Sequence, residues 1–134
     1  MAEPMDDAKR EAARFLMERM TGPGFADAME AAAASGGFGA DVARLAMEHV
    51  FADVWARPGL ALRDRSLVVI AVLVAQGQPA ELKNHLRFGL NNGLTPAEIE
   101  EALIQTIPYV GFPAIAGALA AAVEVLRERG LDQG

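Results

Sequence analysis

The stretch QPAELKNHLRFGLNNG, residues 78–93, decides how the rest of the chain is interpreted. Pro79 suits the first turn of a helix, where its missing N–H costs nothing, and Gly93 favours the left-handed conformation that ends one. Leucines recur every four residues from Leu82, so one face of the helix is apolar and packs against a core. The stretch therefore predicts a short amphipathic helix with well-marked ends.

Glu81 and His85 interrupt this apolar face. They are four residues apart, which makes them neighbours on the helix surface, within the arc between Phe88 and Leu82. A titratable pair in an apolar stripe is a candidate for proton transfer, although an ordinary ion pair at a subunit interface has the same spacing. Gly89 lowers helix stability by about 1 kcal/mol relative to alanine, which indicates that something approaches the backbone closely there.

The composition indicates a helical protein with one core. A chain of 134 residues is long enough for one domain, and its hydrophobic residues make up 52% while aromatics make up only 6%. A core built from small aliphatic side chains favours closely packed helices. So much apolar surface on a small chain also predicts subunit contacts. The net charge of -6 and the scattered 12 Lys and Arg argue against nucleic acid as a partner.

Several kinds of site are excluded or disfavoured by residue usage. The chain has no cysteine, which excludes disulfides, thiolate nucleophiles and cysteine-ligated zinc. The two histidines, His49 and His85, lack the spacing of a metal site, so no metal is expected. The acidic N-terminus has no apolar signal core, and the longest apolar run, residues 67–75, is too short to cross a bilayer. We therefore expect a cytoplasmic protein with no membrane partner.

Helical periodicity and end signals continue along the chain. Asp6 or Asp7 is expected to cap a first helix, Asp41 to cap a longer one, and His49 to be a core or interface imidazole. Thr95 and Glu98 are expected to form a capping box at the start of a further helix. The predicted helices cover residues 5–20, 25–34, 41–55, 62–76, 79–91, 96–107 and 112–130.

The run of residues 67–75 has the β-branched content of a buried strand. Charged residues at its start, Gly77 after its end and its overall length favour a helix, which should be central and fully buried. Pro108 should kink or interrupt the helix that follows Thr95. The sum is an all-α single domain, residues 1–134, of about six or seven helices, with an N-terminal arm over 1–40 and a core over 41–130.

Four segments in order resemble a known family. They are VWARPGL at 54–60, LRDRSL at 62–67, ELKNHLR at 81–87 running into NNG at 91–93, and YVGFPA at 109–114. Together, over roughly residues 53–120, the chain resembles the γ-carboxymuconolactone decarboxylases, which belong to the alkylhydroperoxidase D-like superfamily. The resemblance implies an all-helical subunit assembled as a ring-like homo-oligomer, a trimer or hexamer.

Two departures qualify what the resemblance implies. The redox members of the superfamily carry a Cys-x-x-Cys before the histidine, and those positions here are Gln78 and Glu81. Peroxidase or peroxiredoxin activity is therefore not expected. The decarboxylases carry a Val-Leu-Gly-x-x-His-Val segment near the start, whereas residues 16–24 here contain no histidine. A different substrate is compatible with that change.

The activity implied is that of a cofactor-free decarboxylase acting on 4-carboxymuconolactone or a related carboxylated lactone in aromatic-compound catabolism. His85 would deliver a proton, and Glu81 would orient the imidazole and favour its protonated form. Arg63 or Arg65 would bind a carboxylate of the small anionic substrate, and Ser66 would donate a hydrogen bond to an oxyanion. The alternatives are a same-fold enzyme for another carboxylated or enolisable molecule, and a non-catalytic oligomeric binding protein.

Overall fold

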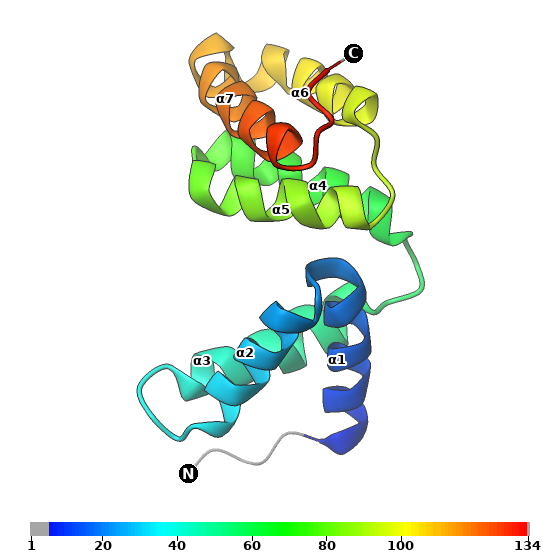
Figure 1. The fold of residues 1–134 in the computed structure, drawn as a ribbon, viewed down its shortest axis with the longest axis vertical. Helices are drawn as coiled ribbons and strands as arrows, with labels where there is room; N and C mark the ends of the chain where they lie inside the picture. Colours follow the sequence, from blue (N-terminus) through cyan, green and yellow to red (C-terminus); the bar gives the residue numbers. More distant parts are fainter. Residues whose placement is uncertain (1–5, 134) are drawn as a thin grey trace. The chain divides into compact units, whose positions relative to one another are not determined.

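The computed structural model describes residues 6–133, and Met5, where the first helix was expected to begin, lies outside them. Every regular element among the described residues is a helix, which confirms the all-α prediction. The helices form two compact units, Met1–Leu60 and Ala61–Gly134 (Figure 1). Within the first unit, the helices after residue 40 pack with those before it. The expected division into an arm over 1–40 and a core over 41–130 stays a prediction.

Unit 1 contains α1 (Asp7–Thr21), α2 (Pro23–Ala34), α3 (Ala40–Leu45) and the π-helix η1 (Ala46–Trp55). Asp6 caps α1 by accepting a hydrogen bond of 2.9 Å from the N–H of Ala8, as predicted. Gly39, at φ 89°, precedes α3 without any side-chain cap. The predicted cap at Asp41 is therefore wrong, because the left-handed glycine already turns the chain into the helix.

The core of unit 1 lies between α1 and the continuous α3–η1 segment. From η1 it takes the buried side chains of Met47, Phe51 and Trp55. His49 does not join them, since 72% of its side chain is exposed and its Nδ1 lies 3.9 Å from the Asp53 carboxylate. The core reading of His49 is wrong. The α1 side of the core consists of Ala13, Leu16, Met17 and Met20.

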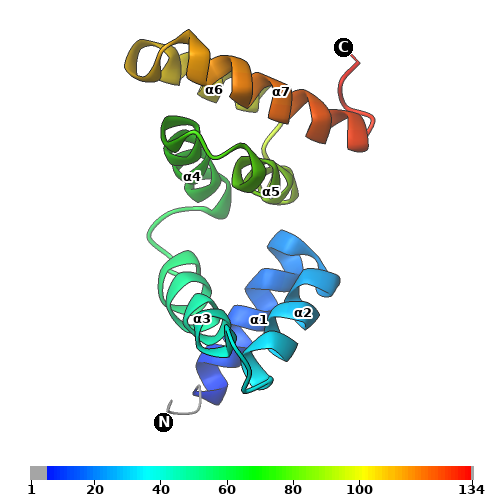
Figure 2. The ribbon, with the colours of Figure 1, turned by 90° about the vertical axis from the view of Figure 1, so that its left-hand side faces the viewer.

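Unit 2 contains α4 (Leu62–Gln76), α5 (Pro79–Asn91), α6 (Pro96–Val110) and α7 (Phe112–Glu128). Within this unit, α6 and α7 lie over α4 and α5 in both ribbon views (Figures 1 and 2). The run of residues 67–75 is helical, as predicted. It is not fully buried, because Val68 and Val72 are 57% and 46% exposed on the side of α4 that faces away from the core.

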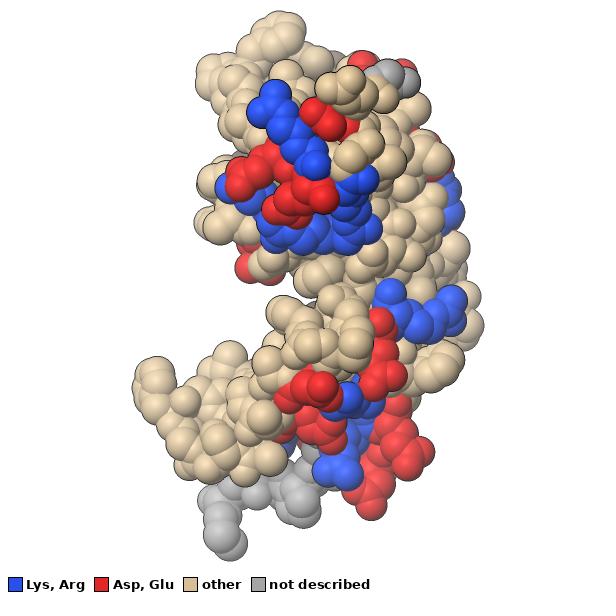
Figure 3. All heavy atoms as spheres, viewed as in Figure 1, with Lys and Arg blue, Asp and Glu red and all other residues tan. Residues whose placement is uncertain are grey.

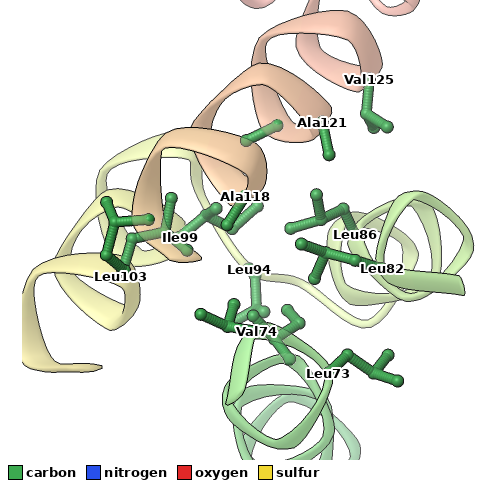
Figure 4. Packing of buried hydrophobic residues seen from close by; sticks show 13 residues of the cluster. Leu73, Val74, Leu82, Leu86, Leu94, Ile99, Leu103, Ala118, Ala121 and Val125 are labelled. Carbon is green, nitrogen blue, oxygen red and sulfur yellow. The ribbon is translucent and has the colours of Figure 1, made fainter. Parts of the chain in front are cut away.

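All four helices contribute to one hydrophobic cluster (Figure 4). Leu82 and Leu86 on α5 are 2% and 1% exposed, which confirms the apolar face predicted for this helix. The cluster consists of Ile70, Leu73, Val74, Leu82, Leu86, Leu94, Ile99, Leu103, Ile115, Ala118, Ala121, Ala122 and Val125.

Helix α5 ends as its sequence predicts. Gly93 has φ 103°, and the N–H of Leu94 donates to the Gly89 carbonyl at 2.9 Å. This folds the buried Leu94 side chain back onto the helix. A Cβ at Gly89 would lie 2.9 Å from Leu94 Cδ1 and 3.6 Å from the Cβ of Ser66 on α4. The glycine is therefore explained by close packing on both sides.

The start of α6 carries the predicted capping box. The Thr95 side chain accepts from the Glu98 N–H at 3.1 Å, and the Glu98 carboxylate accepts from the Thr95 N–H at 3.0 Å. Pro108 lies inside α6, which continues to Val110 without interruption. Over residues 6–133, no helix combines the length and apolarity needed to cross a membrane.

Candidate active site

Helix α5 brings Glu81 and His85 together, as their spacing predicts. Glu81 Oε1 and His85 Nε2 are 3.9 Å apart, which is beyond hydrogen-bond distance but close enough for attraction between charges. The His85 side chain is 16% exposed, whereas the Glu81 side chain is 57% exposed. The imidazole thus lies at the edge of the packed helix layer, with the carboxylate on its outer side.

The environment of His85 keeps the imidazole neutral near pH 7. Burial is the larger cause and lowers the pKa of His85 below its ordinary value of 6.5, while the negative charge of Glu81 acts to raise it. The sequence predicted that Glu81 would favour the protonated form, and the direction of that effect is right. The effect of Glu81 is too small to raise the pKa of His85 above its ordinary value, because desolvation disfavours the charged imidazolium more strongly.

Phe88 is the aromatic neighbour of His85. The two ring centroids are 5.1 Å apart and the ring planes meet at 75°, an edge-on contact. Phe88 is 7% exposed, so its ring is held in packing. The Nδ1 atom of His85 is buried, and Nε2 is the nitrogen that lies toward Glu81. Sequence reasoning used Phe88 only to mark the apolar face, although its i, i+3 spacing from His85 was the available signal.

Ser66 lies in the contact between α4 and α5. It is fully buried, and its Oγ accepts a hydrogen bond of 3.0 Å from Nδ2 of Asn92, just after α5. This bond joins the beginning of α4 to the end of α5. The role predicted for Ser66, donation to an oxyanion, stays a prediction. Asn92 was missed as its partner, because the two residues are distant in sequence.

The two candidate arginines on α4 differ in their surroundings. Arg63 Nη1 lies 2.9 Å from Asp64, and the same guanidinium pairs with Glu98 of α6. It lines an open groove of about 550 Å³ between α4 and α6, and Glu81 and His85 are not among the residues lining that groove. Arg65 is half-buried on α4. Arg63 is thus directed toward α6, with its charge already shared between two carboxylates.

Charged and polar contacts join α5 to α7 on the side of α5 that faces away from His85. Arg87 makes two bonds to Glu128, at 3.0 and 2.8 Å. Figure 3 shows positive and negative side chains interleaved over these helices. Further contacts join Lys83 to Glu124 at 2.6 Å and Arg129 to Asn91 at 2.8 Å. These contacts hold α5 in place without using its His85 face.

The resulting arrangement suits proton transfer at one atom. A neutral, half-buried imidazole can accept or donate a proton near neutral pH. The His85 nitrogen nearest to the Glu81 carboxylate is Nε2. Over the described residues, 6–133, no three His, Asp or Glu side chains come together as a metal site would require.

Comparisons with known proteins identify the family. The model described as the carboxymuconolactone decarboxylase family matches residues 40–124. The chain is 40% identical over 94 residues to 4-carboxymuconolactone decarboxylase of Acinetobacter baylyi, covering 70% of each protein. It is 33% identical over 90 residues to nitrosuccinic acid decarboxylase of Metarhizium robertsii, covering 67% of this chain and 62% of that relative, less than two thirds of its length. The chain belongs to the carboxymuconolactone decarboxylase family.

Proposed function

We propose that this protein is a cofactor-free decarboxylase that releases CO2 from a small carboxylated molecule, and that 4-carboxymuconolactone, an intermediate of aromatic catabolism, is its first candidate substrate. The observation that carries the proposal is the half-buried His85 beside Glu81, within the region that matches the family. Both relatives named above are decarboxylases by name, which supports the reaction type.

The reaction needs no cofactor, because the substrate itself accepts the electron pair that CO2 leaves behind. When a carboxylated unsaturated lactone loses CO2, the electron pair of the broken C–C bond flows through the conjugated double bond into the lactone carbonyl. The product is a dienolate, which takes one proton on carbon. The protein has to hold a carboxylate, stabilise the developing oxyanion and deliver that proton.

His85 is suited to the proton delivery. Its imidazole is neutral in the free protein because burial lowers its pKa. A bound anionic substrate adds negative charge nearby, which favours the imidazolium and raises that pKa. The imidazolium then transfers its Nε2 proton to the dienolate carbon and is reprotonated from water. One proton is consumed for each CO2 released.

Nitrosuccinic acid, the compound in the second relative's name, suggests a wider substrate class. Loss of CO2 from the carbon that bears a nitro group leaves a nitronate, in which the electrons rest on oxygen just as they do in a dienolate. The shared class is a carboxylic acid whose carbanion is delocalised onto oxygen. A substrate other than the lactone is also compatible with residues 16–24, which lack the histidine of the family's usual segment.

The direct test is an assay of CO2 release by the purified protein with 4-carboxymuconolactone and, separately, with nitrosuccinate. Carbon dioxide released from either compound, faster than from the compound in buffer, supports the proposal. Release from the lactone alone assigns it to aromatic catabolism. No release from either compound would overturn both named substrates and favour the two alternatives, an enzyme for another carboxylated or enolisable molecule or a non-catalytic binding protein.

Arg63 and Arg65 are both candidates for binding a substrate carboxylate, and each is tested by its lysine variant. We expect the variant at the residue that binds the carboxylate to raise KM by about ten- to a hundredfold, since a planar two-point contact worth about 1.5–3 kcal/mol is lost while the charge is kept. Arg63→Lys and Arg65→Lys lie on the same helix and control for each other, so the other variant should leave KM near the wild-type value. If neither variant raised KM, neither arginine would bind the carboxylate.

The assembly predicted from the resemblance, a ring-like trimer or hexamer, is part of the proposal. It is supported by large apolar side chains that are exposed in the single chain, among them Val68 at 57%, Tyr109 at 82% and Phe112 at 71%. Light scattering coupled to size-exclusion chromatography would measure the mass directly, and a monomer would contradict the prediction. The cytoplasmic location and the absence of nucleic acid or membrane partners stay predictions.

A further inference from the structure

We propose that Phe88 is a positioning residue for His85: its ring fixes the plane of the imidazole, so that Nε2 is the nitrogen presented to the substrate. The consequence for catalysis rests on the proposed function. The orientation of the ring does not, and it can be tested without any substrate.

The contact between the rings is specific in geometry. Phe88 lies three residues after His85, so the two side chains are neighbours on one face of α5. Their centroids are 5.1 Å apart at 75°, the edge-on arrangement that aromatic quadrupoles favour. Phe88 is itself 7% exposed, and the next residue, Gly89, lets α5 pack closely against α4. A ring held in this way limits how far the imidazole beside it can turn.

Glu81 is less suited to orient the imidazole. Its carboxylate oxygen is 3.9 Å from Nε2, beyond hydrogen-bond distance, and its side chain is 57% exposed. An exposed carboxylate at this separation acts through its charge. The orientation that the sequence assigned to Glu81 is therefore better explained by Phe88, with Glu81 adding an electrostatic effect.

Charged groups on the neighbouring helices do not compete with this arrangement. On α7, Glu124 and Glu128 pair with Lys83 and Arg87, on the other side of α5. The charged groups of α4 are Arg63, Asp64 and Arg65, near its N-terminus. Among the described residues, Glu81 is the charged group that acts on the pKa of His85, alongside the larger effect of burial.

The test compares Phe88→Leu with Leu90→Ala. Leu90 lies on the same helix and packs against the hydrophobic cluster of unit 2, so its variant controls for packing lost from α5. Phe88→Met, whose unbranched side chain adapts to the shape of the gap, serves if the leucine variant does not fold. Thermal unfolding checks each protein, and NMR follows the His85 imidazole through a pH titration. Nuclear Overhauser effects between the two rings are measured in the wild type.

If Phe88 positions His85, the wild type shows contacts between the two rings, and the Phe88 variants titrate at higher pH because more water reaches the imidazole. We also expect kcat to fall about ten- to a hundredfold with little change in KM, and the pH profile of kcat to move with the titration. The Leu90 variant should keep the wild-type titration and profile.

Two results would overturn the proposal. One is the absence of contacts between the rings in the wild type. The other is a Phe88 variant that loses stability while its His85 titration and pH profile match those of the wild type, which is the behaviour of a purely structural residue. Should the wild type release no CO2 at all, the proposed function fails, but the ring contacts and the titration still decide whether Phe88 positions His85.

Discussion

Replacing His85 by alanine is expected to lower kcat for CO2 release by about 10²- to 10⁴-fold, the usual contribution of a positioned acid or base. The variant removes the imidazole that supplies the proton to the dienolate, while CO2 loss from an electron-accepting substrate retains a slow background rate. It should still fold, since the side chain lies at the edge of the packed layer and is not part of the hydrophobic cluster. Steady-state kinetics with the reactive substrate measure the effect.

The other histidine provides the matched control for this prediction. His49 lies on η1 in unit 1, and 72% of its side chain is exposed. His49→Ala should keep near-normal turnover, which would show that the loss belongs to one imidazole. A folded His85→Ala protein with near-normal turnover would remove His85 from the chemistry.

Leu86→Ala is expected to lower the free energy of unfolding by about 2–5 kcal/mol, the range for a large-to-small change in a packed core. Leu86 is 1% exposed and points into the cluster shared by α4, α5, α6 and α7 (Figure 4). The variant separates the stability of unit 2 from its chemistry, because the side chain lies beside His85 in sequence but on the core side of the helix. Urea unfolding followed by circular dichroism measures the loss.

Leu119 on α7 is the control for Leu86, since it has the same side chain but is 51% exposed. Leu119→Ala should change the free energy of unfolding by no more than about 0.5 kcal/mol. Equal losses in the two variants would show that the cluster does not carry the stability of this unit.

Local signals allowed the helix ends of unit 2 to be predicted. The capping box of Thr95 and Glu98 and the left-handed Gly93 depend only on residues a few positions away. Neither the π-helical form of η1 nor the outward direction of His49 has such a local signal. The exposed side of α4 was missed for the same reason, because an all-apolar stretch does not reveal which side chains the neighbouring helices cover.

In the candidate site, too, the local features could be predicted and the contacts between helices could not. Glu81 and His85 could be paired from their spacing, since one turn of helix brings them together. The surroundings of Arg63 could not be predicted, because its partner Glu98 comes from another helix. The hydrogen bond from Asn92 to Ser66 likewise joins residues from opposite ends of a helical hairpin. Residue spacing also could not show whether burial of the imidazole or the charge of Glu81 has the larger effect on the pKa of His85.

An NMR titration of the His85 imidazole, without and with saturating succinate, tests the central claim most directly. Succinate is a dicarboxylate that lacks an electron acceptor and so binds without reacting, and a His49→Gln variant identifies the His85 signal. The account predicts a midpoint below 6.5 in the free protein, because burial disfavours the imidazolium, and a higher midpoint when the dianion is bound. A midpoint at or above 6.5 that does not respond to succinate would contradict it.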